Sequence, residues 1–116
     1  MFSFLRRQTP EIAVDELDEL LNGGQAHLLD VREDWEFRRG HVPGALHIPL
    51  GQLGQRFAEL PQGERVVVIC QSGNRSLAAT DFLLTQGFIG SVSVAGGTSA
   101  WVRSGRPLED GPARAA

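Results

Sequence analysis

The most distinctive apolar run of the sequence is residues 66–69, four consecutive β-branched side chains. A run of this kind is typical of a strand buried on both faces of a parallel sheet. The run stops at Cys70, and four short polar or glycine residues follow it. From Arg75 or Ser76 onward the apolar residues recur at helical spacing until Gly87, which favours the end of a helix. The pattern therefore predicts a strand, a tight loop and a helix, with Cys70 where the strand ends.

Shorter apolar patterns on both sides of this unit predict the remaining elements. We expect further strands over 10–13, 26–31, 46–48 and 91–95. We expect helices over 14–21 and 33–39, from Pro49 onward, and over 98–103. Strands that alternate with helices through short connections indicate an α/β domain with a mostly parallel sheet and helices on both faces.

The length of 116 residues suits one domain and is too short for two. We assign residues 10–107 to this domain and residues 1–9 to an N-terminal tail. Residues 108–116 contain Gly111, Pro112 and mostly small or charged side chains. We therefore expect a flexible C-terminal tail over 108–116.

Charge and cysteine content exclude several classes of function. The net charge is −3, with eleven arginines, no lysine and acidic residues throughout, so no basic stripe suggests nucleic acid binding. No apolar run approaches the roughly twenty residues of a membrane span. The single cysteine excludes an intramolecular disulfide, and the sequence assembles no structural zinc site. Because a low cysteine content fits a reducing compartment, we expect a cytoplasmic protein.

The position of Cys70 is one where chemistry can occur. Ligands of open α/β sheets bind outside the carboxyl ends of the strands. A short turn into a helix leaves backbone N–H groups unpaired, with the positive end of the helix dipole behind them. Such groups can hold a sulfur anion at Cys70, or an oxyanion such as thiosulfate, phosphate or arsenate. A free cysteine is more often a small buried hydrophobe, but the polar residues 71–74 and the bend expected at Gly73 favour a reactive, accessible thiolate.

Residues 70–76 resemble the active-site loop of the rhodanese family, sulfurtransferases that carry sulfane sulfur as a cysteine persulfide. Segments 30–45 and 96–101 resemble the framework of the family in order and spacing, and the resemblance covers about 12–107. It implies a three-layer rhodanese-like α/β fold with a five-stranded, mostly parallel sheet, and Cys70 as the catalytic residue. The substrate-binding residues that it implies are Gln71, Ser72, Gly73, Asn74, Arg75 and Ser76.

The charged residues near this loop allow two interpretations each. Asp30 and Arg32 are supporting residues under the resemblance, a pair that braces the pocket loops rather than touching substrate. Arg75 either draws an anionic donor towards Cys70 or forms a salt bridge with a carboxylate such as Glu36 or Asp81. Gln71, Ser72 and Asn74 are expected to contribute mainly their backbone amides, with their side chains lining the entrance.

The remaining histidines and tryptophans favour structural roles. His41, between Gly40 and Pro43, is expected to support a loop rather than to act as a general base. His27 and His47 show no partner and no metal-ligand spacing in the sequence. Trp101 is expected in the core, and Trp35 at the mouth of the pocket.

The resemblance implies a sulfurtransferase that moves sulfur from a small anionic donor such as thiosulfate through a Cys70 persulfide. The acceptor is cyanide in an assay and a thiol or protein sulfur acceptor in the cell, with no metal or organic cofactor. One alternative is a phosphatase or arsenate reductase of the same fold. Related phosphatases have five residues between cysteine and arginine, whereas residues 71–74 make four. A non-catalytic binding module is the other alternative, and the presence of Cys70 argues against it.

Overall fold

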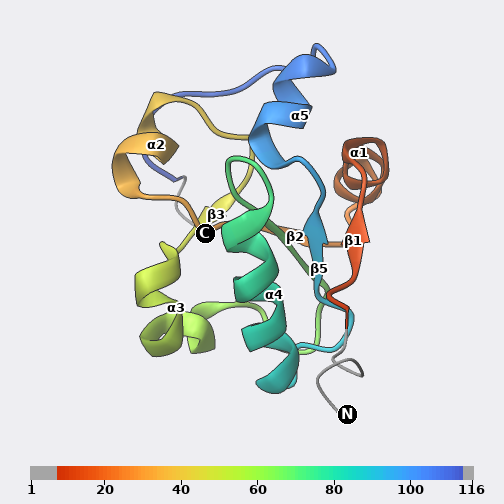
Figure 1. Ribbon diagram of the computed structural model, residues 1–116, viewed down its shortest axis with the longest axis vertical. Helices are drawn as coiled ribbons and strands as arrows, with labels where there is room; N and C mark the ends of the chain where they lie inside the picture. Colours follow the sequence, from red (N-terminus) through yellow and green to blue (C-terminus); the bar gives the residue numbers. More distant parts are fainter. Residues whose placement is uncertain (1–7, 114–116) are drawn as a thin grey trace.

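The computed structural model describes residues 8–113 of the chain, and strands alternate with helices throughout (Figure 1). The N-terminal tail expected over 1–9 lies outside the described residues except for its last two positions. The strands are β1 (Glu11–Ile12), β2 (His27–Asp30), β3 (Leu46–His47), β4 (Val66–Ile69) and β5 (Val92–Val94). The helices are α1 (Val14–Asn22), α2 (Asp34–Arg39), α3 (Leu50–Arg56), the 3-10 helix η2 (Phe57–Glu59), α4 (Asn74–Thr85) and α5 (Gly97–Arg103).

The five strands form one sheet in the order β1-β5-β4-β2-β3, and every neighbouring pair is parallel. Strand β4 is central, with β2 on one side and β5 on the other. The α/β fold and the five-stranded sheet expected from the sequence are confirmed. Because all the strands run in one direction, their carboxyl ends meet at one edge, where Asp30 and Ile69 are register partners.

Strand β4 supplies side chains to both faces of the sheet, because successive residues of a strand point in opposite directions. Val67 and Ile69 pack in one cluster with side chains of α1, α2 and α5. Val66 and Val68 pack in the other cluster with side chains of α3 and α4. The sheet is therefore covered on both faces, and Cys70 belongs to the α3–α4 side.

Helix α4 begins one residue earlier than the sequence predicts, at Asn74. The residue before it, Gly73, has φ 107°, a left-handed conformation that glycine adopts without strain. This conformation turns the chain sharply out of β4 and into the helix. The amides of the loop consequently face back towards the end of β4.

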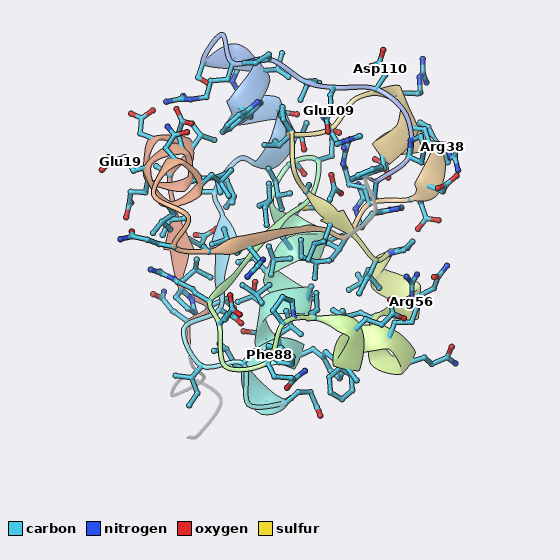
Figure 2. All side chains as sticks on the ribbon, turned by 180° about the vertical axis from the view of Figure 1, so that it is seen from behind. Glu19, Arg38, Arg56, Phe88, Glu109 and Asp110 are labelled. Atoms are coloured by element: carbon cyan, nitrogen blue, oxygen red, sulfur yellow. The ribbon has the colours of Figure 1, made fainter. Side chains whose placement is uncertain are left out.

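Residues 108–113 differ from the flexible tail that composition suggests. The amide of Glu109 donates to the carbonyl of His41 over 2.9 Å, and the amide of His41 donates to Glu109 over 3.0 Å. Beyond them, the Gly111 amide donates to Arg38, and Ala113 packs on the core. Figure 1 shows this segment passing from α5 towards α2, and Figure 2 shows Glu109 and Arg38 at the same end of the molecule. Backbone pairing, which composition does not reveal, holds the segment.

In the part of the chain that the structure describes, no helix has the length and apolar character to cross a membrane.

Candidate active site at Cys70

The sulfur of Cys70 lies inside the loop that connects β4 to α4. It accepts hydrogen bonds from the backbone amides of Gly73 at 3.1 Å and Ser76 at 3.3 Å. The thiol also lies 3.3 Å from the hydroxyl oxygen of Ser76, to which it donates. Two backbone amides therefore converge on one sulfur at the N-terminal end of α4.

Cys70 is 1% exposed, so the accessible thiolate expected from the sequence is instead a sulfur enclosed by its own loop. The loop closes over the sulfur through the amides of Gly73 and Ser76, which both have Sγ as their acceptor. The exposed side chains of the loop are those of Ser72 and Asn74, which make no hydrogen bond within residues 8–113. The amides that donate to Sγ are those of Gly73 and Ser76, whereas the sequence pointed mainly to the amides of Gln71, Ser72 and Asn74.

The start of α5 holds the loop from the other side. The amide and the hydroxyl of Thr98 both donate to the carbonyl oxygen of Cys70, over 2.8 and 3.1 Å. The amide of Ser99 donates to the carbonyl of Gln71 over 3.0 Å. At Gly97 a Cβ atom would collide with the Cys70 carbonyl oxygen, so this close approach requires glycine. These contacts turn the carbonyls away from Sγ and leave the amides facing it.

Asp30 and Arg32 form a buried ion pair beneath the loop. The guanidinium of Arg32 donates to both carboxylate oxygens of Asp30 over 2.9–3.1 Å. It also donates to the carbonyl of Gly40 and to the side-chain oxygen of Gln71. The Gln71 amide group in turn donates to Ser99 over 2.9 Å. The side chain of Gln71 therefore ties the loop to β2 and α5, and it also lines the pocket beside the loop.

Arg75 forms a salt bridge with Glu36, and this resolves the choice that the sequence left open. Its two terminal nitrogens donate to the two carboxylate oxygens of Glu36 over 2.7 and 2.9 Å. Asp81, the other candidate partner, accepts from Thr9. The hydrogen bond from Arg75 holds the pKa of Glu36 below its ordinary value. The same contact raises the pKa of Arg75, and the negative charge of Glu36 adds to that shift.

Two residues near the sulfur were not found by sequence reasoning. The hydroxyl of Ser93, fully buried on β5, lies 2.7 Å from that of Ser76. Thr98 binds the Cys70 carbonyl as described above. The only signal in the sequence is a polar residue within an apolar strand at position 93. That signal does not reveal which side chain Ser93 meets.

The histidines contact structural partners. His41 is buried, stacks on Phe37 with ring centroids 3.6 Å apart, and lies 2.8 Å from the Phe37 carbonyl through Nδ1. His47 stacks on the same ring and contacts the carbonyl of Arg32. His27 has a partner that the sequence did not suggest, Glu64 at 2.6 Å. Within residues 8–113 no three metal-ligating side chains gather as a metal site requires.

The two tryptophans lie where the sequence suggests, one in the core and one beside a pocket. Trp101 is 4% exposed in the core, and its indole N–H donates to the Pro107 carbonyl. Trp35 is 61% exposed and lines a pocket beside the Cys70 loop.

A parallel α/β sheet that presents one thiol to the amides of a helix start defines a cysteine-centred α/β domain. A family model described as a rhodanese-like domain matches residues 13–104, and the chain belongs to this family. The Bacillus subtilis protein YrkF is 36% identical over 93 residues, which cover 79% of this chain and 50% of YrkF. The chain thus spans half the length of that relative.

Two further similarities cover nearly whole proteins. Thiosulfate sulfurtransferase 16 of Arabidopsis thaliana is 35% identical over 115 residues, which cover 89% of this chain and 95% of that protein. The crystal structure of a rhodanese-related protein from Thermoplasma volcanium superposes with a TM-score of 0.78 at 33% identity. That match covers 86% of this chain and 97% of the other.

Proposed function

We propose that the protein is a sulfurtransferase in which Cys70 carries the transferred sulfur. The Cys70 thiolate attacks the outer sulfur of a small anionic donor such as thiosulfate. A bond forms between Sγ and that sulfur, the bond to the sulfite sulfur breaks, and sulfite leaves with the electron pair. The product is a persulfide anion on Cys70. The observation that carries this proposal is the pair of amides, from Gly73 and Ser76, that donate to Sγ.

The loop stabilises negative charge on sulfur in both states of the reaction. Backbone amides fixed in a turn need no reorganisation when charge develops, as in an oxyanion hole. The hydroxyl of Ser76 is held by Ser93 and can rotate to donate to the thiolate. In this proposal Asp30 and Arg32 position the loop through Gln71, and Arg75 sets the local charge together with Glu36.

In the second half-reaction a thiophilic acceptor takes the outer sulfur and returns Cys70 to its thiolate form. Cyanide serves in the assay and yields thiocyanate, whereas a small thiol or a protein thiol serves in the cell. Since the two half-reactions share a covalent intermediate, we expect ping-pong kinetics. A free reactive thiol persists in a reducing compartment, which favours the cytoplasm as the site of this activity.

A phosphatase is the alternative enzyme, and the Arg75 contact argues against it. A phosphatase loop binds the phosphate through its arginine, and here both terminal nitrogens of Arg75 are already engaged by Glu36. The loop has four residues between Cys70 and Arg75, and its two amide donors meet on a single sulfur. We therefore expect negligible activity on an aryl phosphate. Efficient hydrolysis by the unmodified protein would reverse the ranking of these two functions.

The proposal is tested by following the sulfur on the protein itself. After incubation with excess thiosulfate and removal of the donor, native mass spectrometry should show the gain of one sulfur atom. Addition of cyanide should remove that sulfur and release an equal amount of thiocyanate. The Cys70→Ser protein should show neither event while keeping the thermal unfolding of the wild type. Thiocyanate formation by Cys70→Ser would overturn the mechanism.

A further inference from the structure

A pocket of about 370 Å³ lies beside the Cys70 loop, between α2, α5 and the C-terminal segment. Its wall shares three residues with the surroundings of the sulfur: Gln71 follows Cys70, Thr98 holds the Cys70 carbonyl, and Glu36 pairs with Arg75. Figure 1 shows the loop before α4 between α2 and α5. The volume lies in the range of small-molecule binding sites, and it greatly exceeds what cyanide or thiosulfate needs.

Exposed apolar side chains gather at this pocket. The large apolar side chains that are exposed among residues 8–113 number four: Trp35 at 61%, Val102 at 49%, Leu108 at 37% and Ile89 at 87%. The first three come from α2, α5 and the C-terminal segment, and all three line the pocket. Single exposed apolar residues need no explanation, but several from separate segments around one hollow mark a binding site.

The same pocket contains a cation that has no carboxylate partner among residues 8–113. Arg39 is exposed, lies with its guanidinium 5.9 Å from the centre of the Trp35 ring, and forms no ion pair within residues 8–113. Its neighbour Arg38 is already paired with Asp34 at 2.8 Å. The other arginine in the wall, Arg32, is buried and bound to Asp30. Arg39 is therefore the group in this pocket that can bind an anion, and a guanidinium binds carboxylates through two parallel hydrogen bonds.

We infer that this pocket binds the sulfur acceptor, and that the acceptor is a small organic thiol with an apolar body and a carboxylate. The inference rests on the proposed sulfur transfer. The apolar body lies against Trp35, Val102 and Leu108, and the carboxylate pairs with Arg39. Bound in this way, the thiol is beside the loop that holds the persulfide.

The transfer step balances without a further reactant. The acceptor thiol passes its proton to the outer sulfur of the Cys70 persulfide anion, and the resulting thiolate attacks that sulfur and forms a new S–S bond. The bond between that sulfur and Cys70 Sγ breaks, and its electron pair returns to Sγ, where the Gly73 and Ser76 amides receive it. The persulfide proton stays on the transferred sulfur. The acceptor leaves as an organic persulfide, and Cys70 is again a thiolate.

The test compares two acceptors that differ in charge but not in shape or in the thiol. Protein loaded with sulfur from thiosulfate is freed of donor and mixed with 4-(mercaptomethyl)benzoate or with its neutral amide, 4-(mercaptomethyl)benzamide. Loss of the persulfide is followed by mass spectrometry. Each second-order rate constant is divided by the rate constant of the same variant with cyanide. This division separates acceptor binding from the reactivity of the persulfide.

We expect wild type to discharge about tenfold faster to the carboxylate than to the amide, the effect of one charge-assisted contact. Arg39→Gln should reduce this preference to about one, whereas Arg38→Gln, at a paired arginine outside the pocket, should keep it. Trp35→Ala should slow both aromatic acceptors several-fold relative to cyanide, and Ile89→Ala should not.

Three results would overturn the inference. The first is an equal rate for carboxylate and amide in wild type, and the second is a preference that survives Arg39→Gln. The third is negligible discharge to both thiols together with rapid discharge to a protein thiol, which would make the pocket a protein docking surface. Each of these leaves the cyanide reaction intact, and so leaves the proposed function standing. Failure to form a persulfide at all would instead remove the proposed function, and this inference with it.

Discussion

Two arginine–carboxylate pairs flank the Cys70 loop, and they differ in almost everything except their geometry. Both are bidentate, with nitrogen–oxygen distances between 2.7 and 3.1 Å. The Asp30–Arg32 pair is nearly inaccessible to water, whereas the Arg75 side chain is 35% exposed. A buried pair stabilises the fold only as a unit, because either partner alone is an uncompensated charge. A partly exposed pair contributes little to stability and can be used to adjust the local charge.

The largest expected effect is on the buried pair. Asp30→Asn leaves the guanidinium of Arg32 buried without its counter-charge, and breaking a buried pair in this way costs about 3 kcal/mol or more of unfolding free energy. Urea unfolding of purified protein measures the loss. Asp34→Asn is the matched control, because it breaks the exposed pair with Arg38 and should cost much less. Equal losses of unfolding free energy in the two variants would contradict the expectation that the buried pair matters more for stability than the exposed one.

The next effect concerns charge near the sulfur. Arg75→Gln leaves Glu36 uncompensated and should lower kcat/KM for thiosulfate about fivefold at low salt, since like charges repel over this range. Glu36→Gln should raise it by a similar factor, and the double variant should return close to wild type. Added salt should reduce both changes. If the double variant is as slow as Arg75→Gln alone, the guanidinium acts by direct contact with the donor rather than through net charge.

The smallest expected effect is the pH dependence of the stability that the Arg75–Glu36 pair contributes to the fold. Because Arg75 holds the folded-state pKa of Glu36 below its ordinary value, the pair stabilises the fold at pH values above that ordinary value. As the pH falls through the lowered folded-state pKa, Glu36 becomes protonated and the contribution is lost. We expect the unfolding free energy of wild type to exceed that of Glu36→Gln by about 1 kcal/mol or less at neutral pH. At low pH the two unfolding free energies should be equal. The measurement is the urea midpoint of both proteins from neutral to acidic pH. A difference between the two midpoints that stays constant over this range would contradict the prediction.

The sequence predicts the unit from β4 to α4 well, because its signals are local. The apolar run 66–69, the polar loop and the helical spacing after it all lie within about twenty residues of one another. The hydrogen-bond partners are less predictable, because they come from distant segments. Glu36 and Arg75 are 39 positions apart, and Gln71 and Ser99 are 28 apart. Periodicity predicts which elements form, whereas only the packed sheet reveals which side chains meet.

The backbone pairing of residues 108–113 is a second feature that composition does not reveal. Residues 108–116 look like a tail because small and charged side chains have little to bury. Pairing of Glu109 with His41 uses backbone groups that every residue carries, so side-chain composition gives no sign of it. Leu108 forms part of the pocket wall as a result, and the acceptor site includes a segment that the sequence assigns outside the domain.

The contact between Cys70 and the start of α5 has a consequence for biosynthesis. Chains emerge from the ribosome in order, and domains fold as their segments become available. The cysteine and its loop precede Gly97 and Thr98 by nearly thirty residues, so the thiol is made well before the segment that locks its carbonyl. During that interval the Cys70 carbonyl lacks the two donors of Thr98 that hold the loop in its finished geometry. A chain with a single cysteine cannot be trapped by a wrong internal disulfide at this stage, and completion of α5 then closes the site.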